Sequence, residues 1–244
     1  MRFTLKSNKG YLNQVQLENI TPFALPKGEK RTNFKIDAEA SVRYGNKTLL
    51  VAFERINRIL AYDFSSFNFN GLPTAFPTPK SMKSLPRTGG IEAMTELCDG
   101  RIIAISEHGL YGEDARRGWI LRNGKWSDFG YQPSDGYNPT GAALLPDCRI
   151  VVLERRFQLL SFSWRMAVLS PAKIQPGAIA HGEPLGTFTD PPLADNFEAI
   201  AVRRSSTGET LIYAMSDDNF SFLQQTLLLV FALKQKPQGP ATRQ

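Results

Sequence analysis

The stretch Gly90-Ile-Glu-Ala-Met-Thr-Glu-Leu97, Cys98-Asp-Gly100, Arg101-Ile-Ile-Ala-Ile-Ser-Glu107 contains two short apolar segments joined by a turn. Each segment has the length of a β-strand, and the residues between them are common turn residues. The second segment is a nearly continuous apolar run, which is typical of a strand covered on both faces. The stretch therefore predicts a buried β-hairpin.

The same pattern occurs three more times along the chain. Each copy has an acidic or polar start, an apolar strand, a turn and a second strand that ends near an acid; the copies span residues 37–55, 90–107, 139–156 and 195–218. From Glu39 to Glu92 is 53 positions, from Glu92 to Thr140 is 48, and from Thr140 to Glu198 is 58. Repeats of roughly 40–50 residues with several strands each are typical of β-propeller blades. The sequence therefore predicts an all-β, propeller-like domain over residues 1–233 with about four recognisable blades.

Further strands and loops complete the expected repeats. A third strand is expected in each blade, at residues 58–64, 118–122, 157–162 and 226–233. Residues 65–89, 108–117 and 171–192 are expected to be loops, and no amphipathic helix of any length is apparent. Residues 3–25 resemble the end of one more, partial blade, which predicts an incomplete ring.

Composition limits the possible partners. The net charge is +6, but the basic residues are scattered and no nucleic-acid-binding module is recognisable, so nucleic acid is not an expected partner. Two cysteines, Cys98 and Cys148, do not make a disulfide framework, and with only two histidines they leave little material for a zinc site. The longest apolar run, 227–233, is too short to span a bilayer. Residues 234–244 are expected to form a disordered basic tail.

Acidic residues recur at two places in the repeats. Because equivalent positions of successive blades lie at similar radius and height, these carboxylates are expected to gather near the central axis. Clustered carboxylates repel one another unless a cation or arginine neutralises them, and Ca²⁺ prefers such oxygen ligands, although another divalent metal would also fit. The residues expected to bind metal are Asp37, Glu39, Glu107, Asp195 and Asp218. Those expected to be catalytic are Glu92, Glu198 and Asp217, with Arg55 and Arg155 expected to bind the substrate.

A structural interpretation of the same acids is equally open. A carboxylate at a recurring blade position often accepts backbone N–H bonds or pairs with a nearby arginine, and this interpretation is favoured for Glu54 and Glu154. A serine hydrolase is not indicated: the chain has no Gly-x-Ser-x-Gly turn, and the adjacent residues Ser106, Glu107 and His108 cannot form a triad because strand neighbours diverge. The alternative function is a non-catalytic propeller that binds a ligand or partner.

The repeated motifs resemble the bacterial family described as esterase-like activity of phytase, or phytase-like. Four stretches carry this resemblance, which covers about residues 37–233: Asp37-Ala-Glu39 with Val51-Ala-Phe-Glu-Arg55; Gly90–Met94 with Asp99–Glu107; Pro139–Asp147 with Val152–Phe157; and Asp195–Glu198 with Ser216–Ser221.

The resemblance implies a propeller-like fold and hydrolysis of phosphomonoesters or phosphodiesters, with a phosphorylated small molecule as substrate. It also implies frequent export, to the periplasm or beyond. Similar proteins usually begin with a further repeat, so we expect this chain to lack the start of its first blade, through a late start codon or truncation. The apolar core of a signal peptide is not seen in residues 1–10, which is uninformative if that start is missing. The oligomeric state does not follow from the sequence.

Overall fold

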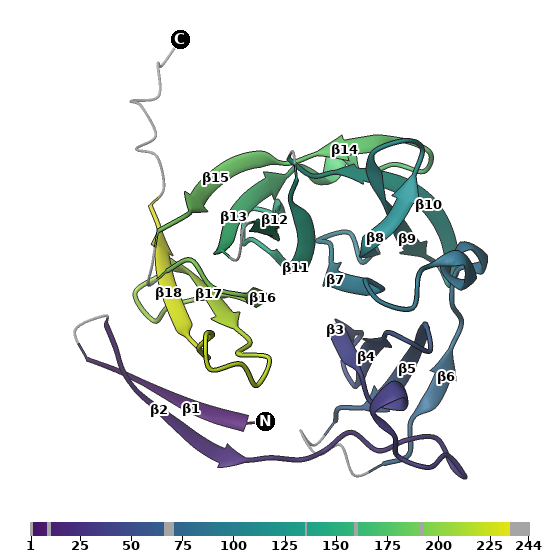
Figure 1. Cartoon of the computed structure of the whole chain (residues 1–244), viewed down its shortest axis with the longest axis horizontal. Helices are drawn as coiled ribbons and strands as arrows, with labels where there is room; N and C mark the ends of the chain where they lie inside the picture. The colour runs from purple at the N-terminus through teal and green to yellow at the C-terminus, as the bar shows by residue number, and fades with distance from the viewer. Residues whose placement is uncertain are drawn as a thin grey trace.

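The computed structural model describes residues 2–8, 11–65, 71–134, 136–158, 161–190 and 193–234. Four β-sheets stand radially around a common axis, and a two-stranded hairpin lies in the remaining part of the ring, between the fourth sheet and the first (Figure 1). The four sheets are the blades of a β-propeller. The predicted all-β fold class, with four blades and a partial N-terminal one, is confirmed.

Each blade is built from consecutive antiparallel strands, the first of which lies nearest the axis (Figure 1). Blade 1 contains β3 (Ala38–Tyr44), β4 (Thr48–Phe53), β5 (Arg58–Asp63) and β6 (Thr74–Phe76). Blade 2 contains β7 (Ile91–Glu96), β8 (Ile102–Tyr111), β9 (Ala115–Arg122) and β10 (Lys125–Gln132), with β14 (Ile179–His181) added in parallel to β10. Blade 3 contains β11 (Asn138–Leu144), β12 (Ile150–Gln158), β13 (Ser161–Leu169) and β15 (Glu183–Phe188). Blade 4 contains β16 (Phe197–Arg204), β17 (Thr210–Ser216) and β18 (Leu228–Leu233), and the hairpin contains β1 (Arg2–Asn8) and β2 (Tyr11–Asn19).

The hydrophobic core lies between the blades. Separate clusters of buried side chains fill the space between blades 1 and 2, between blades 2 and 3, and between blades 3 and 4. Trp119 and Trp164 are completely buried in the first and third of these clusters. This arrangement explains the continuous apolar runs of strands such as β8, because both faces of the strand are covered by neighbouring blades.

The free face of blade 1 is covered by the segment that follows the hairpin. Phe23 packs against Phe53 and Tyr62, with ring centroids 6.4 Å and 5.0 Å away. The hydroxyl of Tyr62 donates a hydrogen bond to the carbonyl of Ala24 (2.9 Å). These contacts anchor the hairpin's connection to the outer side of the first blade.

Several expectations for local structure need correction. Residues 157–162 are not a third strand: Phe157 and Gln158 are the end of β12, and Ser161 and Phe162 are the start of β13. The segments 65–89 and 171–192, expected to be loops, contribute β6, β14 and β15, because short edge strands carry too few apolar residues to stand out in the sequence. Segment 108–117 also belongs largely to β8 and β9. Of the expected tail, residues 235–244 lie outside the described residues.

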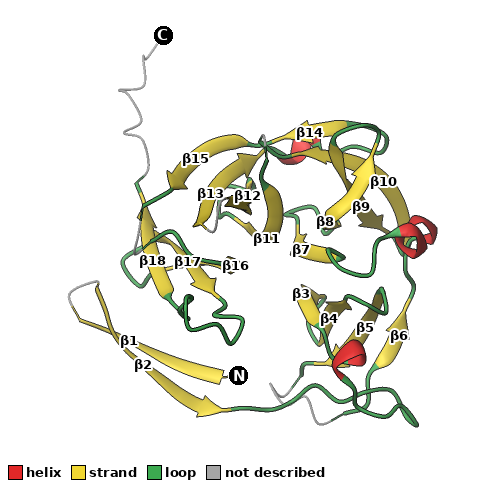
Figure 2. Ribbon diagram, viewed as in Figure 1, coloured by secondary structure: helices red, strands yellow, loops and turns green. Residues whose placement is uncertain are grey.

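Helices in the described part of the chain are three short 3₁₀ turns, shown in red in Figure 2: η1 (Asn33–Lys35), η2 (Lys80–Ser84) and η3 (Pro171–Lys173). None of them is long and apolar enough to cross a membrane.

Cys98 and Cys148 form a disulfide, a bond that was not expected from a sequence with only two cysteines. They lie in the β7–β8 turn and the β11–β12 turn, and their Cα atoms are 5.5 Å apart. The two residues occupy equivalent turns of adjacent blades, so the propeller geometry brings them together although 50 positions separate them in the sequence. The bond joins blade 2 to blade 3.

Replacing both cysteines by serine is expected to lower the free energy of unfolding by about 2–4 kcal/mol, because the bond restricts a long loop of the unfolded chain. Denaturant unfolding of the oxidised protein and of the double variant measures this difference. A reducing agent should leave the stability of the variant unchanged. The same agent should lower the stability of the wild-type protein to that of the variant. Equal stability of all three samples would contradict the expectation.

Candidate functional site

A β-bulge at the same position of every blade directs one side chain toward the axis. In each innermost strand the pairing with the second strand skips one residue; the skipped residues are Glu39, Glu92, Thr140 and Glu198. A bulge leaves its extra residue outside the ladder and re-aims the side chain. Three blades therefore present a glutamate at this level, and blade 3 presents a threonine, whose hydroxyl donates a hydrogen bond to the carbonyl of Phe197 (3.0 Å).

A second set of equivalent residues comes from the ends of the second strands. The backbone N–H groups of Glu54, Glu107 and Asp217 each donate to a carbonyl just before the innermost strand of the same blade. In blade 3 the equivalent position is occupied by Arg155. Glu154 pairs with Pro139 next to the bulge, and Arg155 is the residue that follows Glu154. Blade 3 thus has an arginine where the other blades have a carboxylate.

Apart from Thr140, the residues of these two sets line a polar pocket of about 290 Å³. A smaller cavity of about 120 Å³ shares Glu39, Glu92 and Glu198 with it and continues between the innermost strands. The side chains that line the main pocket are Asp37, Glu39, Glu54, Arg55, Thr88, Glu92, Glu107, His108, Arg155, Glu198, Asp217 and Asn219, together with Gly89. Seven carboxylates and two arginines share this space, so the pocket carries a strong negative charge.

Arg155 neutralises the side of the pocket formed by blades 2 and 4. Its guanidinium donates to Glu107 (2.8 Å) and forms a second ion pair with Glu198. The same group also donates to the side-chain oxygen of Asn196. Each of these acids therefore already has a cationic partner.

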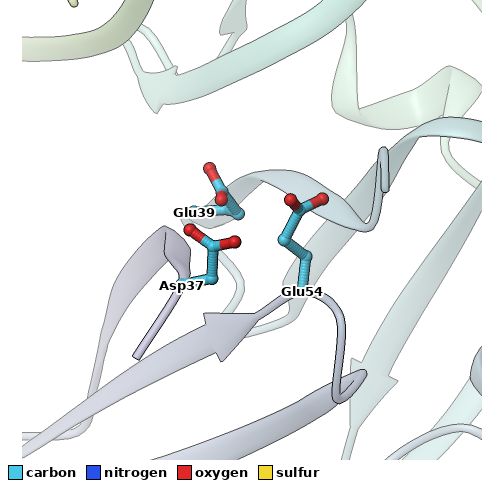
Figure 3. A group of neighbouring side chains, drawn as sticks. All are labelled: Asp37, Glu39 and Glu54. Atoms are coloured by element: carbon cyan, nitrogen blue, oxygen red, sulfur yellow. The ribbon is translucent and has the colours of Figure 1, made fainter. Parts of the chain in front are cut away.

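The blade 1 side keeps a denser group of acids. The carboxylates of Asp37, Glu39 and Glu54 point toward one another (Figure 3), and each offers an oxygen that lies within 4.8 Å of the others. Glu54 accepts a hydrogen bond from the backbone N–H of Gly89 (2.8 Å), and Arg55 pairs with Asp37. Three carboxylates with one neighbouring arginine leave an excess of negative charge, which is the electrostatic requirement for binding a cation.

The electrostatics of the bulge residues reflect this crowding. Burial, together with repulsion from neighbouring carboxylates, chiefly Glu54, raises the pKa of Glu39 to about 7. Burial and the charge of Glu39 raise the pKa of Glu92 well above its ordinary value. Burial also raises the pKa of Glu198, although the nearby Arg155 opposes the shift. These acids therefore hold their protons to a higher pH than free carboxyl groups do, and a cation would compete with those protons.

The structure brings together eight of the ten residues expected at the site. The two that lie elsewhere are Asp195 and Asp218, whose carboxylates accept hydrogen bonds from the loop after β17. Asp195 accepts from the backbone N–H groups of Asn196 (2.7 Å) and Gln225 (3.1 Å). Asp218 accepts from the N–H of Phe220 (2.9 Å) and the hydroxyl of Thr226 (3.2 Å). Both residues therefore support the loop and do not line the pocket.

Glu154 points away from the pocket into the interface of blades 2 and 3. It is completely buried, accepts the Tyr131 hydroxyl (2.5 Å) and pairs with Arg165 (2.5 Å). The structural interpretation favoured for Glu154 agrees with this position. The same interpretation was incomplete for Glu54, which accepts a backbone hydrogen bond but also lines the pocket.

Thr88, His108 and Asn219 also line the pocket, although they were not among the ten residues expected at the site. His108 packs on Gly89, where even a Cβ atom would lie 2.0 Å from its ring, and its Nδ1 is 3.4 Å from Glu107. The signal that could have identified His108 and Asn219 was their position just after the acids at the strand ends.

Comparison with solved structures gives distant likenesses. A protein of unknown function from Bacteroides caccae is 9% identical with a TM-score of 0.39, over 79% of this chain and 60% of that one. The Dos1 propeller is 12% identical with a TM-score of 0.41, over 82% of this chain and 49% of that one. The PQQ-bound aldose sugar dehydrogenase from Streptomyces coelicolor is 10% identical with a TM-score of 0.39, over 79% of this chain and 81% of that one. The chain thus spans about half to three fifths of the first two, and likenesses at this level say nothing about activity.

Among curated proteins no sequence matches this chain. A protein-family model described as esterase-like activity of phytase matches residues 1–220, nearly the whole chain. The family expected from the repeated motifs is therefore confirmed, and the chain belongs to the phytase-like family.

Proposed function

We propose that the protein is a metal-dependent hydrolase of phosphoesters whose site is the axial acidic pocket. The observation that supports this most strongly is the convergence of carboxylates from blades 1, 2 and 4 on one small polar pocket that also holds two arginines. Membership of the phytase-like family is consistent with the proposal. The substrate would be a phosphorylated small molecule or another phosphate monoester or diester.

The residues on the blade 1 side fit a hard divalent cation. Asp37, Glu39 and Glu54 supply only carboxylate oxygens, the donors that Ca²⁺ and Mg²⁺ prefer. Ca²⁺ accepts six to eight oxygen ligands, so three carboxylates together with water could satisfy it. We therefore propose these three residues as the ligands, in place of the wider set that the sequence suggested.

A bound cation would attract the phosphate group and polarise its P–O bonds. The protein's own residues would then position and protonate the substrate. Arg155 lies across the pocket from the three carboxylates and presents a planar guanidinium, which can bind two phosphate oxygens once it exchanges a carboxylate partner. Arg55 forms an ion pair with Asp37 and would likewise bind phosphate oxygens, on the blade 1 side of the pocket.

Proton transfer is assigned to Glu92, Asp217 and Glu198, which line the pocket. Because burial and the neighbouring carboxylates raise the pKa of Glu92 well above its ordinary value, Glu92 is suited to donate a proton to the oxygen of the departing alcohol. Asp217 stands on the blade 4 side and can accept a proton from the attacking water, with Glu198 beside it as a second acceptor. This division makes Glu92 the proton donor and Asp217 and Glu198 the proton acceptors.

Turnover of simple phosphomonoesters and phosphodiesters is expected only in the presence of a divalent cation. Glu92→Gln and Asp217→Asn should each lower kcat by about 100-fold or more, because they remove the proton donor and acceptor. Glu183→Gln is a suitable control, since Glu183 is exposed and pairs with Lys173, outside the pocket. Absence of turnover with every metal tested, or undiminished turnover in the two pocket variants, would refute the proposal.

We also propose that the protein acts outside the cytoplasm. The Cys98–Cys148 disulfide supports this, because such bonds persist in oxidising compartments. The family resemblance points in the same direction.

A further inference from the structure

A buried asparagine, Asn196, binds the pocket residue Arg155. Asn196 is completely buried and is not among the residues that line the pocket. Its side-chain oxygen accepts a hydrogen bond from the guanidinium of Arg155. Its Nδ2 donates to the carboxylate of Glu198 (3.0 Å) and to the backbone carbonyl of Asp217 (3.1 Å). One amide therefore connects three residues of the candidate site.

The backbone of Asn196 is held by separate contacts. Its N–H donates to the carboxylate of Asp195 (2.7 Å), and its carbonyl accepts from the N–H of Asp217 (3.0 Å). The next residue, Phe197, is completely buried in the core between blades 3 and 4. The amide thus belongs to a well-packed part of blade 4, and the position of its oxygen fixes where the guanidinium of Arg155 lies.

The equivalent position of blade 1 is occupied by an acid. Asn196 stands two residues before the bulge residue Glu198, and Asp37 stands two residues before the bulge residue Glu39. Asp37 forms an ion pair with Arg55, so a phosphate group would have to displace this carboxylate. An amide oxygen carries no net charge, and it therefore holds a guanidinium without neutralising it.

Arg155 has two kinds of partner, and only one kind competes with phosphate. The carboxylates of Glu107 and Glu198 line the pocket and are anions, so a phosphate group can replace either of them at the guanidinium. Asn196 is neutral and lies behind the residues that line the pocket, so its bond to Arg155 can remain during this exchange.

We propose that Asn196 is a positioning residue that holds Arg155 in the pocket while the guanidinium exchanges a carboxylate for phosphate. This inference rests on the proposed function, because it concerns the phosphate-binding role assigned there to Arg155. It also makes Arg155 a stronger phosphate ligand than Arg55, whose partner at the equivalent position is a carboxylate.

Calorimetric binding of inorganic phosphate at a fixed Mg²⁺ concentration tests this role without any turnover. Asn196→Asp keeps the shape of the side chain, but it removes the donor to Glu198 and adds a negative charge beside Arg155. The variant should bind phosphate about tenfold more weakly or worse. The matched control is Asn138→Asp, because Asn138 occupies the equivalent position of blade 3 and binds Arg116 instead. This control should bind phosphate nearly as well as the wild-type protein.

A double-mutant comparison separates positioning from a general loss of structure. Arg155→Met should weaken phosphate binding at least as much as Asn196→Asp does. Adding Asn196→Asp to Arg155→Met should then cause much less than the tenfold loss seen in the wild-type background, because the amide acts through the arginine. If Asn196→Asp does not fold, Asn196→Ser takes its place: the shorter side chain keeps an oxygen acceptor but cannot bridge Arg155 and Glu198, so it should also weaken phosphate binding.

Three results would overturn the proposal: no phosphate binding by the wild-type protein, undiminished binding by the folded Asn196 variant, or an equal loss in both backgrounds. Turnover of phosphoesters is a separate question. A protein that binds phosphate as predicted but hydrolyses no phosphoester would refute the proposed hydrolase and support the positioning role. An active hydrolase whose phosphate binding is unaffected by Asn196→Asp would refute the positioning role alone.

Discussion

Raising the pH of the metal-free protein through the range from about 4.5 to 7 is expected to lower its free energy of unfolding by roughly 3 kcal/mol from Glu39 alone. The folded protein keeps a proton on Glu39 up to a pKa of about 7, whereas the unfolded chain releases it near 4.5. Stability is therefore fully present below the lower value and declines until the pH passes the higher one. Glu92 and Glu198, whose pKa values are also raised, act in the same direction.

Glu39→Gln separates this effect from other titrations. The variant should be more stable than wild-type protein when both are metal-free above neutral pH, and its pH dependence should be weaker. Acids with lowered pKa values, such as Asp99 and Asp147, act below about pH 4 and in the opposite direction, so they do not overlap with this window. Denaturant unfolding over a pH series measures both proteins. A wild-type stability that rises through this window would contradict the predicted convergence of charges.

The largest expected loss of stability follows Glu154→Ala. This substitution leaves the Arg165 guanidinium buried without its carboxylate and the Tyr131 hydroxyl without its acceptor. Removing one partner of a buried ion pair typically costs about 3–5 kcal/mol, which for a domain of this kind is a large part of the total. Chemical denaturation of the variant and of wild-type protein gives the difference.

Two further variants show whether the cost comes from the buried charge. Glu183→Ala removes an exposed partner of Lys173 and should change stability by less than about 1 kcal/mol. Combining Glu154→Ala with Arg165→Met should recover part of the loss, because no unpaired charge then remains in the interface. A loss at Glu154 no larger than that at Glu183 would show that the buried network contributes little.

The sequence predicted the repeats well because the inner strands carry the strongest signals. Strands such as β8 and β12 are buried between blades, so their apolar runs are long. The outer strands β6, β14 and β15 could not be predicted in the same way: they are short, partly exposed, and placed by the curvature of the blade more than by their own side chains. The Cys98–Cys148 bond could not be predicted in this way. It requires two equivalent turns of adjacent blades to lie close together, and this proximity follows only from the three-dimensional arrangement of the blades.

The candidate site, like the fold, could be predicted from the sequence only in part. Repetition in the sequence identified Glu39, Glu92 and Glu198, because one bulge recurs in each blade and directs each residue to the axis. In blade 3 the repeated acid, Glu154, does not lie in the pocket. The pocket residue is its neighbour Arg155, and the two side chains point in opposite directions because neighbours in a strand alternate. The roles of Asp195 and Asp218 in the loop depended on hydrogen bonds to residues up to 30 positions away, which no local pattern encodes.

Anomalous diffraction from a crystal grown with Ca²⁺ tests the central claim most directly, since it locates the ion. We predict a peak in the axial pocket at about 2.3–2.6 Å from carboxylate oxygens of Asp37, Glu39 and Glu54. An empty pocket in crystals that bind the ion at another place would contradict the account.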